Sequence, residues 1–158
     1  MKGFIENIVS LFEAIPTSLI TLLARIIIGL VFFNSGLTKI DGFAIKDSTF
    51  FLFSMEYNVP LVPPVVAAYM ATFAELTMPL LLWVGLGARF AALALLGMTA
   101  VIQTFVYPAA YVTHGLWAVA LLVIVRFGAG YFSIDQIIRS RHASPVPEAH
   151  EGDVMWKS

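Results

Sequence analysis

Residues 19–38 read LITLLARIIIGLVFFNSGLT and contain a single charged side chain, Arg25. A helix that rises 1.5 Å per residue needs about 20 residues to cross a hydrocarbon core about 30 Å thick, so this stretch has the length of a transmembrane helix. Similar stretches with at most one charge each occupy residues 64–84, 90–107 and 115–132. We therefore predict an all-α membrane protein, a bundle of four transmembrane helices.

The composition of the 158-residue chain agrees with this fold class. Hydrophobic residues make up 59% and charged residues 12%, with a mean hydropathy of +0.89. A soluble domain has about 25% charged residues, and disorder requires low hydrophobicity, so both are excluded. A net charge of -1 gives no field that attracts phosphates, which argues against a nucleic-acid partner. Without cysteine the chain has no thiolate ligands for an iron–sulfur cluster or metal.

The flanking segments and the loops predict how the chain is organised. Residues 1–18 include an amphipathic pattern typical of an interfacial helix, residues 19–138 form the membrane domain, and residues 139–158 are expected to be a disordered cytoplasmic tail. The aromatic loop 41–63 is expected to pack on the outer face of the bundle. Five Lys and Arg residues lie on the side of the two termini and two on the other, so the positive-inside rule predicts cytoplasmic termini.

Three charges lie inside the predicted spans. Counted from the nearest cytoplasmic span end, Arg25, Glu75 and Arg126 are all about 9 to 14 Å deep. Charges at this depth are costly, so we expect the three side chains to pair in one intramembrane layer. Two cations and one anion leave a positive surplus that suits an anionic ligand or a reduced-quinone oxygen. The alternative is a purely structural pairing that fixes the helix register.

A second polar cluster is predicted near the outer side of the membrane. It consists of Lys39, Gln103 and His114, with Glu56 and Tyr57 nearby in the aromatic loop. A transmembrane b-type haem needs two axial ligands, and His114 is the one histidine near a span. We therefore expect neither haem nor a metal to be bound by this chain alone.

Several segments resemble the DoxX family of small membrane proteins. They are ARIIIGLVFFNSGLTKI at residues 24–40, EYNVP at 56–60, AEL around Glu75, LLLWVGLGARFAALAL at 80–95 and, after His114, GAGYFSIDQII at 128–138. The resemblance implies a four-helix bundle in the bacterial plasma (inner) membrane. Carried over to this chain, the family's recurrent polar positions are Arg25, Lys39, Glu75, Arg89, His114 and Asp135.

The resemblance leaves several functions open. Some family members are described as the small membrane subunit of a thiosulfate:quinone oxidoreductase, and others as membrane parts of oxidative-stress complexes. The first hypothesis is thus a quinone-associated, redox-linked subunit that works with a partner subunit or as a homo-oligomer, its redox centre lying outside this chain. The second is a non-catalytic anchor or assembly protein for a stress- or metal-response partner. A small-solute permease is disfavoured, because four helices leave little lumen.

Overall fold

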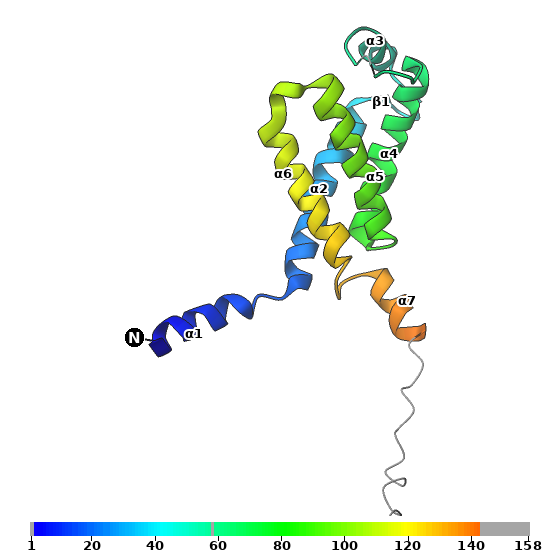
Figure 1. The fold of residues 1–158 in the computed structure, drawn as a ribbon. Helices are drawn as coiled ribbons and strands as arrows, with labels where there is room; N and C mark the ends of the chain where they lie inside the picture. The colour runs from blue at the N-terminus through cyan, green and yellow to red at the C-terminus, as the bar shows by residue number, and fades with distance from the viewer. Residues whose placement is uncertain (1, 58, 143–158) are drawn as a thin grey trace, which may run out of the picture.

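A computed structural model of the chain describes residues 2–57 and 59–142, and these residues are mostly helical (Figure 1). Within them, four helical segments are long and apolar enough to cross a membrane, which confirms the predicted fold class. These segments are α2 (Thr17–Thr38), α4 (Pro64–Val84), α5 (Ala88–Val101) with the π-helical turn Ile102–Val106, and α6 (Tyr111–Phe127) with the 3-10 turn Pro108–Ala110. The shorter elements are α1 (Lys2–Glu13), β1 (Ile40–Asp41), β2 (Ala44–Ile45), α3 (Asp47–Met55) and α7 (Ile134–His142).

The bundle core is built around small side chains on α5. Ala88, Ala91, Ala92 and Leu95 are fully buried at i, i+3, i+4 and i+7 spacing, so one face of α5 lies against its neighbours. Large apolar residues from the other three long helices pack on this face: Ile28, Phe32, Leu82, Leu121 and Ile124.

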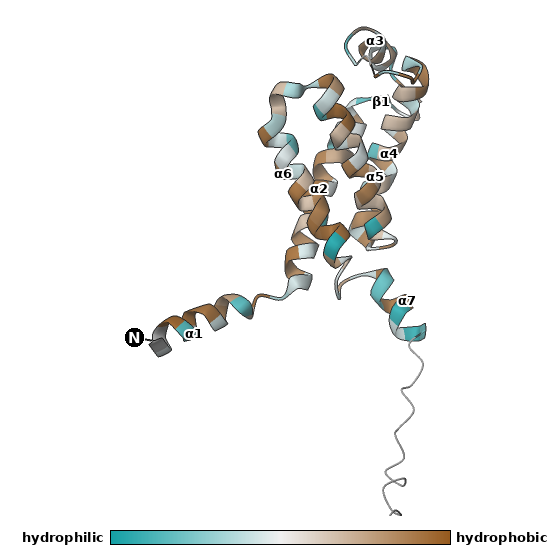
Figure 2. Ribbon diagram, in the orientation of Figure 1, coloured by the Kyte–Doolittle hydropathy of each residue, from teal (hydrophilic) through white to brown (hydrophobic). Residues whose placement is uncertain are grey.

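The outside of the bundle is also apolar. Figure 2 shows hydrophobic residues along the four long helices and hydrophilic residues concentrated in α7. Phe73 and Leu116, for example, are 65% and 67% exposed. Exposing so many large apolar side chains to water would be unfavourable. A surface of this kind requires a lipid bilayer around the four helices.

The two ends of the bundle differ. Figure 1 places α1 and α7 at one end, which we call the terminal end, and β1 and α3 at the other, which we call the hairpin end. At the hairpin end, β1 and β2 form a small antiparallel pair, and α3 packs on α4 by inserting Phe53 against Ala67 and Ala68. The part of the aromatic loop that forms α3 thus lies against the bundle, as its composition indicated.

The helical boundaries correct two predictions. The fourth span was predicted at residues 115–132, but α6 ends at Phe127, because Gly128 adopts a φ of 77° that breaks the helix. The residues after it are apolar too, so hydropathy alone cannot locate this end. The predicted disordered tail began at residue 139, but α7 continues to His142; residues 143–158 lie outside the described residues.

Helix α1 leaves the bundle at a wide angle in Figure 1, and its apolar side chains are uncovered, with Leu11 and Phe12 at 69% and 66% exposure. This arrangement suits a helix that lies in the membrane interface with its apolar face in lipid. The interfacial location stays a prediction.

Gly36 permits the close approach of α2 and α4. A Cβ atom at this position would lie 2.9 Å from Leu76 Cδ2 and 3.1 Å from Glu75 Cβ. We expect Gly36→Val to lower bundle stability by about 1 to 3 kcal/mol, because the two helices must separate. The matched control is Gly97→Val in α5, where a Cβ meets no atom within 4 Å. Equal shifts in the thermal unfolding of the two purified variants would contradict this packing.

Candidate functional site

The ion pair between Lys39 and Glu75 is the centre of the candidate site. Lys39 Nζ lies 2.6 Å from Glu75 Oε2, and the two residues are only 8% and 4% exposed. Lys39 also donates to the hydroxyl (3.1 Å) and the carbonyl (3.3 Å) of Ser35, so its three N–H groups all have acceptors. The Ser35 hydroxyl in turn donates to the second oxygen of Glu75 at 3.3 Å.

Helix geometry explains why Lys39 reaches a buried acid. Side chains on a helix lean toward its N-terminus, so Lys39, the C-cap residue of α2, extends back along the preceding turn to Ser35. Because α4 packs beside this turn through Gly36, Glu75 faces the same point from the middle of its own helix. A lysine just outside the first predicted span therefore pairs with an acid inside the second.

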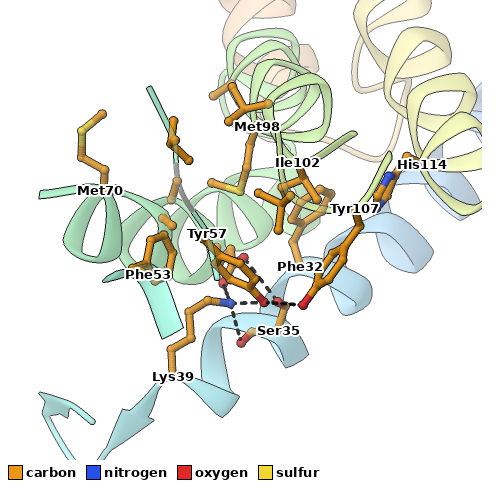
Figure 3. Close-up of a pocket in the computed structure, with 18 of the residues that line it drawn as sticks. Phe32, Ser35, Lys39, Phe53, Tyr57, Met70, Met98, Ile102, Tyr107 and His114 are labelled. Atoms are coloured by element: carbon orange, nitrogen blue, oxygen red, sulfur yellow. Dashed lines mark hydrogen bonds and ion pairs between the residues drawn. The ribbon is translucent and has the colours of Figure 1, made fainter. Parts of the chain in front are cut away.

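The ion pair forms part of the wall of a cavity of about 490 Å³ (Figure 3). Most of the wall is apolar, and its polar side chains are those of Ser35, Lys39, Glu75, Tyr57, Tyr107, His114 and Trp117. Two lining residues, Met70 and Val101, are also 63% and 37% exposed on the outside of α4 and α5. The cavity therefore reaches the lipid-facing surface between these two helices.

Two tyrosines border the cavity at the hairpin end. The Tyr107 hydroxyl donates to the carboxylate of Glu56 at 2.7 Å and is also hydrogen-bonded to the Tyr57 hydroxyl at 3.2 Å. The bond to Tyr57 and the bond to Glu56 raise the pKa of the Tyr107 phenol well above its ordinary value. Tyr107 therefore stays protonated and links the aromatic loop to the end of the third span.

The structure brings His114 and Gln103 together on the other side of the cavity. His114 is 5% exposed and its Nδ1 lies 2.7 Å from Gln103 Oε1. The His114 ring also packs against Trp117, with ring centroids 5.1 Å apart. Lys39, the third member of the predicted cluster, lines the same cavity apart from them, in its ion pair with Glu75.

The predicted layer of Arg25, Glu75 and Arg126 is not formed. Arg25 is fully buried and donates to two backbone carbonyls, that of Leu82 at 3.2 Å and that of Phe132 at 2.7 Å. Arg126 is exposed, and its guanidinium lies 5.4 Å from the ring centroid of Phe127. Among the described residues, no ion pair joins either arginine to Glu75.

The error in the predicted layer comes from the reference points for depth. Arg25 lies level with Leu82, near the end of α4, whereas Glu75 lies level with Ser35. From Arg25 to Ser35 the helix rises about 15 Å. Counting residues from the span ends placed the two charges at one depth. However, α2 begins further out at the terminal end than the point where α4 ends, so the two ends do not mark a common plane.

Arg25 and Asp135 hold the terminal end of the bundle together. Arg25 binds the Leu82 carbonyl in the last turn of α4, which also accepts the backbone N–H of the C-cap residue Gly85 at 3.2 Å. The Asp135 carboxylate accepts hydrogen bonds from the N–H groups of Gly87 (2.8 Å) and Ala88 (3.2 Å) at the start of α5. Arg89, also singled out by the resemblance, is exposed, with its guanidinium beside Gly128. Arg25, Arg89 and Asp135 therefore do not line the cavity.

Sequence reasoning missed Ser35 and Tyr107. Ser35 lies four residues before Lys39 and one before Gly36, so helical spacing from the lysine could have indicated it. Tyr107 was counted as the last residue of a span, and no local pattern connects it to Glu56 and Tyr57, about fifty positions earlier.

One comparison with known proteins identifies a family for this chain. The chain matches the family model for DoxX over residues 20–108, more than half of its length. No curated protein and no solved structure matches the chain. The matched region covers most of α2 and all of α4 and α5, and it includes both partners of the buried ion pair, Lys39 and Glu75. The chain is a member of the DoxX family.

Proposed function

We propose that this membrane protein binds a quinone in the cavity beside Lys39 and Glu75 and serves as the quinone-associated subunit of a redox-linked complex. The observation that carries the proposal is the cavity itself: about 490 Å³, mostly apolar, with a buried ion pair in its wall. Pockets of about 300 to 1,000 Å³ with a few placed polar groups are typical of small-molecule sites. Its opening toward lipid suits a ligand that is dissolved in the bilayer.

The residues present fit such a ligand. Phe32, Met98 and Ile102 offer apolar contacts for a ring (Figure 3). The Lys39 ammonium can donate to a ligand oxygen in place of its 3.3 Å bond to the Ser35 carbonyl. When bound, a quinone would supply two-electron, two-proton redox chemistry. Glu75 holds Lys39 in place and can accept a proton at its carboxylate. The chain has no cysteine, so we place the redox centre on a partner subunit.

The second candidate is an anchor or assembly protein. Helix α1 favours it, because α1 projects from the bundle and leaves apolar side chains such as Leu11 uncovered (Figure 1). Such a helix offers a surface to a partner. In this case the cavity would have no function, and no bound ligand would depend on the ion pair.

Ligand extraction distinguishes the two candidates. We expect the protein purified from a quinone-producing bacterial host to carry quinone, detected by solvent extraction and mass spectrometry. Lys39→Met should reduce the amount at least about fivefold, because it removes a charge-assisted donor. Lys46→Met is the matched control, since Lys46 binds the Thr38 carbonyl outside the cavity. Absence of quinone, or equal amounts in all three proteins, would favour the anchor.

We also propose that the terminal end of the bundle is cytoplasmic and that the membrane is the bacterial inner membrane. The absence of cysteine allows single-cysteine tests. In intact spheroplasts, a membrane-impermeant maleimide is expected to label Asp41→Cys at the hairpin end. It should label Glu13→Cys and Ser140→Cys only after permeabilisation. The reverse pattern would invert the orientation.

A further inference from the structure

A chain of hydrogen bonds fixes the orientation of the His114 ring. Tyr107 N donates to the Ile102 carbonyl at 2.8 Å, an i to i+5 bond that defines the π-helical turn. Gln103 lies in this turn, and its side-chain amide nitrogen donates to the Pro108 carbonyl at 2.8 Å. This bond turns the amide oxygen of Gln103 toward His114 Nδ1. Single π turns of this kind are frequent at functional sites.

The same chain determines which ring nitrogen of a neutral His114 carries the proton. The Pro108 carbonyl can only accept, so the Gln103 nitrogen must be the donor there and its oxygen must be the acceptor for His114. Nδ1 is therefore the protonated nitrogen, as assigned from the hydrogen-bond network. The lone pair of the neutral imidazole then lies on Nε2.

Nε2 of His114 is available to a ligand. His114 lines the cavity, and among the described residues Nε2 has no hydrogen-bond partner. Packing against Trp117 holds the ring in this orientation. The cavity thus has two polar groups of opposite character, a donor at the Lys39 ammonium and an acceptor at His114 Nε2. Figure 3 draws the side chains of Lys39 and His114 well apart.

We propose that His114 Nε2 accepts a hydrogen bond from a hydroxyl group of the ligand, so that the site selects hydroxylated, reduced rings over rings without an O–H group. This inference rests on the proposed function and specifies the form of ligand that the cavity prefers. A bound ring that lacks the O–H donor covers Nε2 without giving it a hydrogen-bond partner. Leaving a polar group unpaired in this way strongly disfavours binding of that ring. We expect the hydroxylated form to bind about tenfold more tightly or better.

Two naphthalene probes test the proposal without any redox change. 4-Methoxy-1-naphthol keeps one O–H donor, and 1,4-dimethoxynaphthalene has the same ring and no donor. Equilibrium dialysis with the full chain in lipid nanodiscs, corrected by protein-free nanodiscs, gives the two Kd values. The wild-type ratio is expected to be about ten or more in favour of the naphthol. His114→Phe keeps the aromatic packing and should bring the ratio to about one. Thr113→Ala, the exposed neighbour, should retain the wild-type ratio.

The outcomes separate this inference from the proposed function. If both probes bind the wild-type protein with equal affinity and compete with a quinone, the cavity is a quinone site and the role of His114 is wrong. A ratio that persists in His114→Phe also overturns that role. If neither probe binds, the proposed function itself fails, and the inference with it.

A spectroscopic measurement tests the tautomer independently of any change at His114. In a chain that carries His142→Gln and His150→Gln, ¹⁵N-labelled histidine reports on His114 alone. The expected spectrum has a protonated Nδ1 and an unprotonated Nε2. A protonated Nε2 would overturn the proposal.

Discussion

Replacing Glu75 by glutamine is expected to lower the free energy of unfolding by about 3 kcal/mol, because it leaves the Lys39 ammonium buried without its counter-charge. Lys39 is 8% exposed and Glu75 is its sole ion-pair partner within the described chain. The side chain of glutamine keeps the shape, so the loss reports on charge rather than on a cavity. Denaturant unfolding of the purified protein in detergent measures it.

The matched control for this variant is Glu13→Gln, at an exposed position in α1, which should change stability by less than about 0.5 kcal/mol. A double-mutant cycle with Lys39→Met isolates the pair. We expect the double variant to be more stable than the sum of the single losses predicts, with a coupling of at least about 1 kcal/mol. Additivity within about 0.5 kcal/mol would show that the two side chains do not interact.

Arg25→Met is expected to cost about 2 to 4 kcal/mol, because Arg25 is fully buried and its guanidinium donates to the carbonyls of Leu82 and Phe132. Methionine preserves much of the apolar length of the side chain. The loss should also free the segment that leads into α7. Limited trypsin digestion is expected to cut after Arg139 and Arg141 faster than in the wild-type protein.

Arg126→Met provides the control, since Arg126 is an exposed arginine within the same bundle. Its effect on stability should stay within about 0.5 kcal/mol. Equal losses for Arg25→Met and Arg126→Met would contradict the contacts of Arg25. An energetic coupling between either arginine and Glu75 in a double-mutant cycle would instead support the predicted layer of Arg25, Glu75 and Arg126.

The span positions could be predicted from the sequence because a bilayer sets a length and an apolar composition that few soluble helices meet. The first two spans illustrate this, since the predicted 19–38 and 64–84 differ from α2 and α4 by at most two residues at either end. The end of α6 was missed, because Gly128 breaks the helix within a stretch that is still apolar.

The partner of Glu75 could not be predicted, because pairing depends on how two helices slide past each other. Hydropathy fixes the length of each helix but not this offset. Lys39 and Glu75 were both singled out, yet they were assigned to different clusters. Gln103 and His114 were assigned to one cluster and are hydrogen-bonded, but the geometry of that bond could not be predicted, since it depends on a π turn with no clear sequence signal.

Photoaffinity labelling is the sharpest test for a quinone site in the cavity. The purified protein in nanodiscs is irradiated with an azido-naphthoquinone, and the modified residues are located by peptide mass spectrometry. We predict that modification concentrates on cavity residues such as Phe32 and Met98, is suppressed by excess unlabelled quinone and falls in Lys39→Met. Labelling spread over outward-facing positions such as Phe73 and Leu116, unaffected by competitor, would contradict the account.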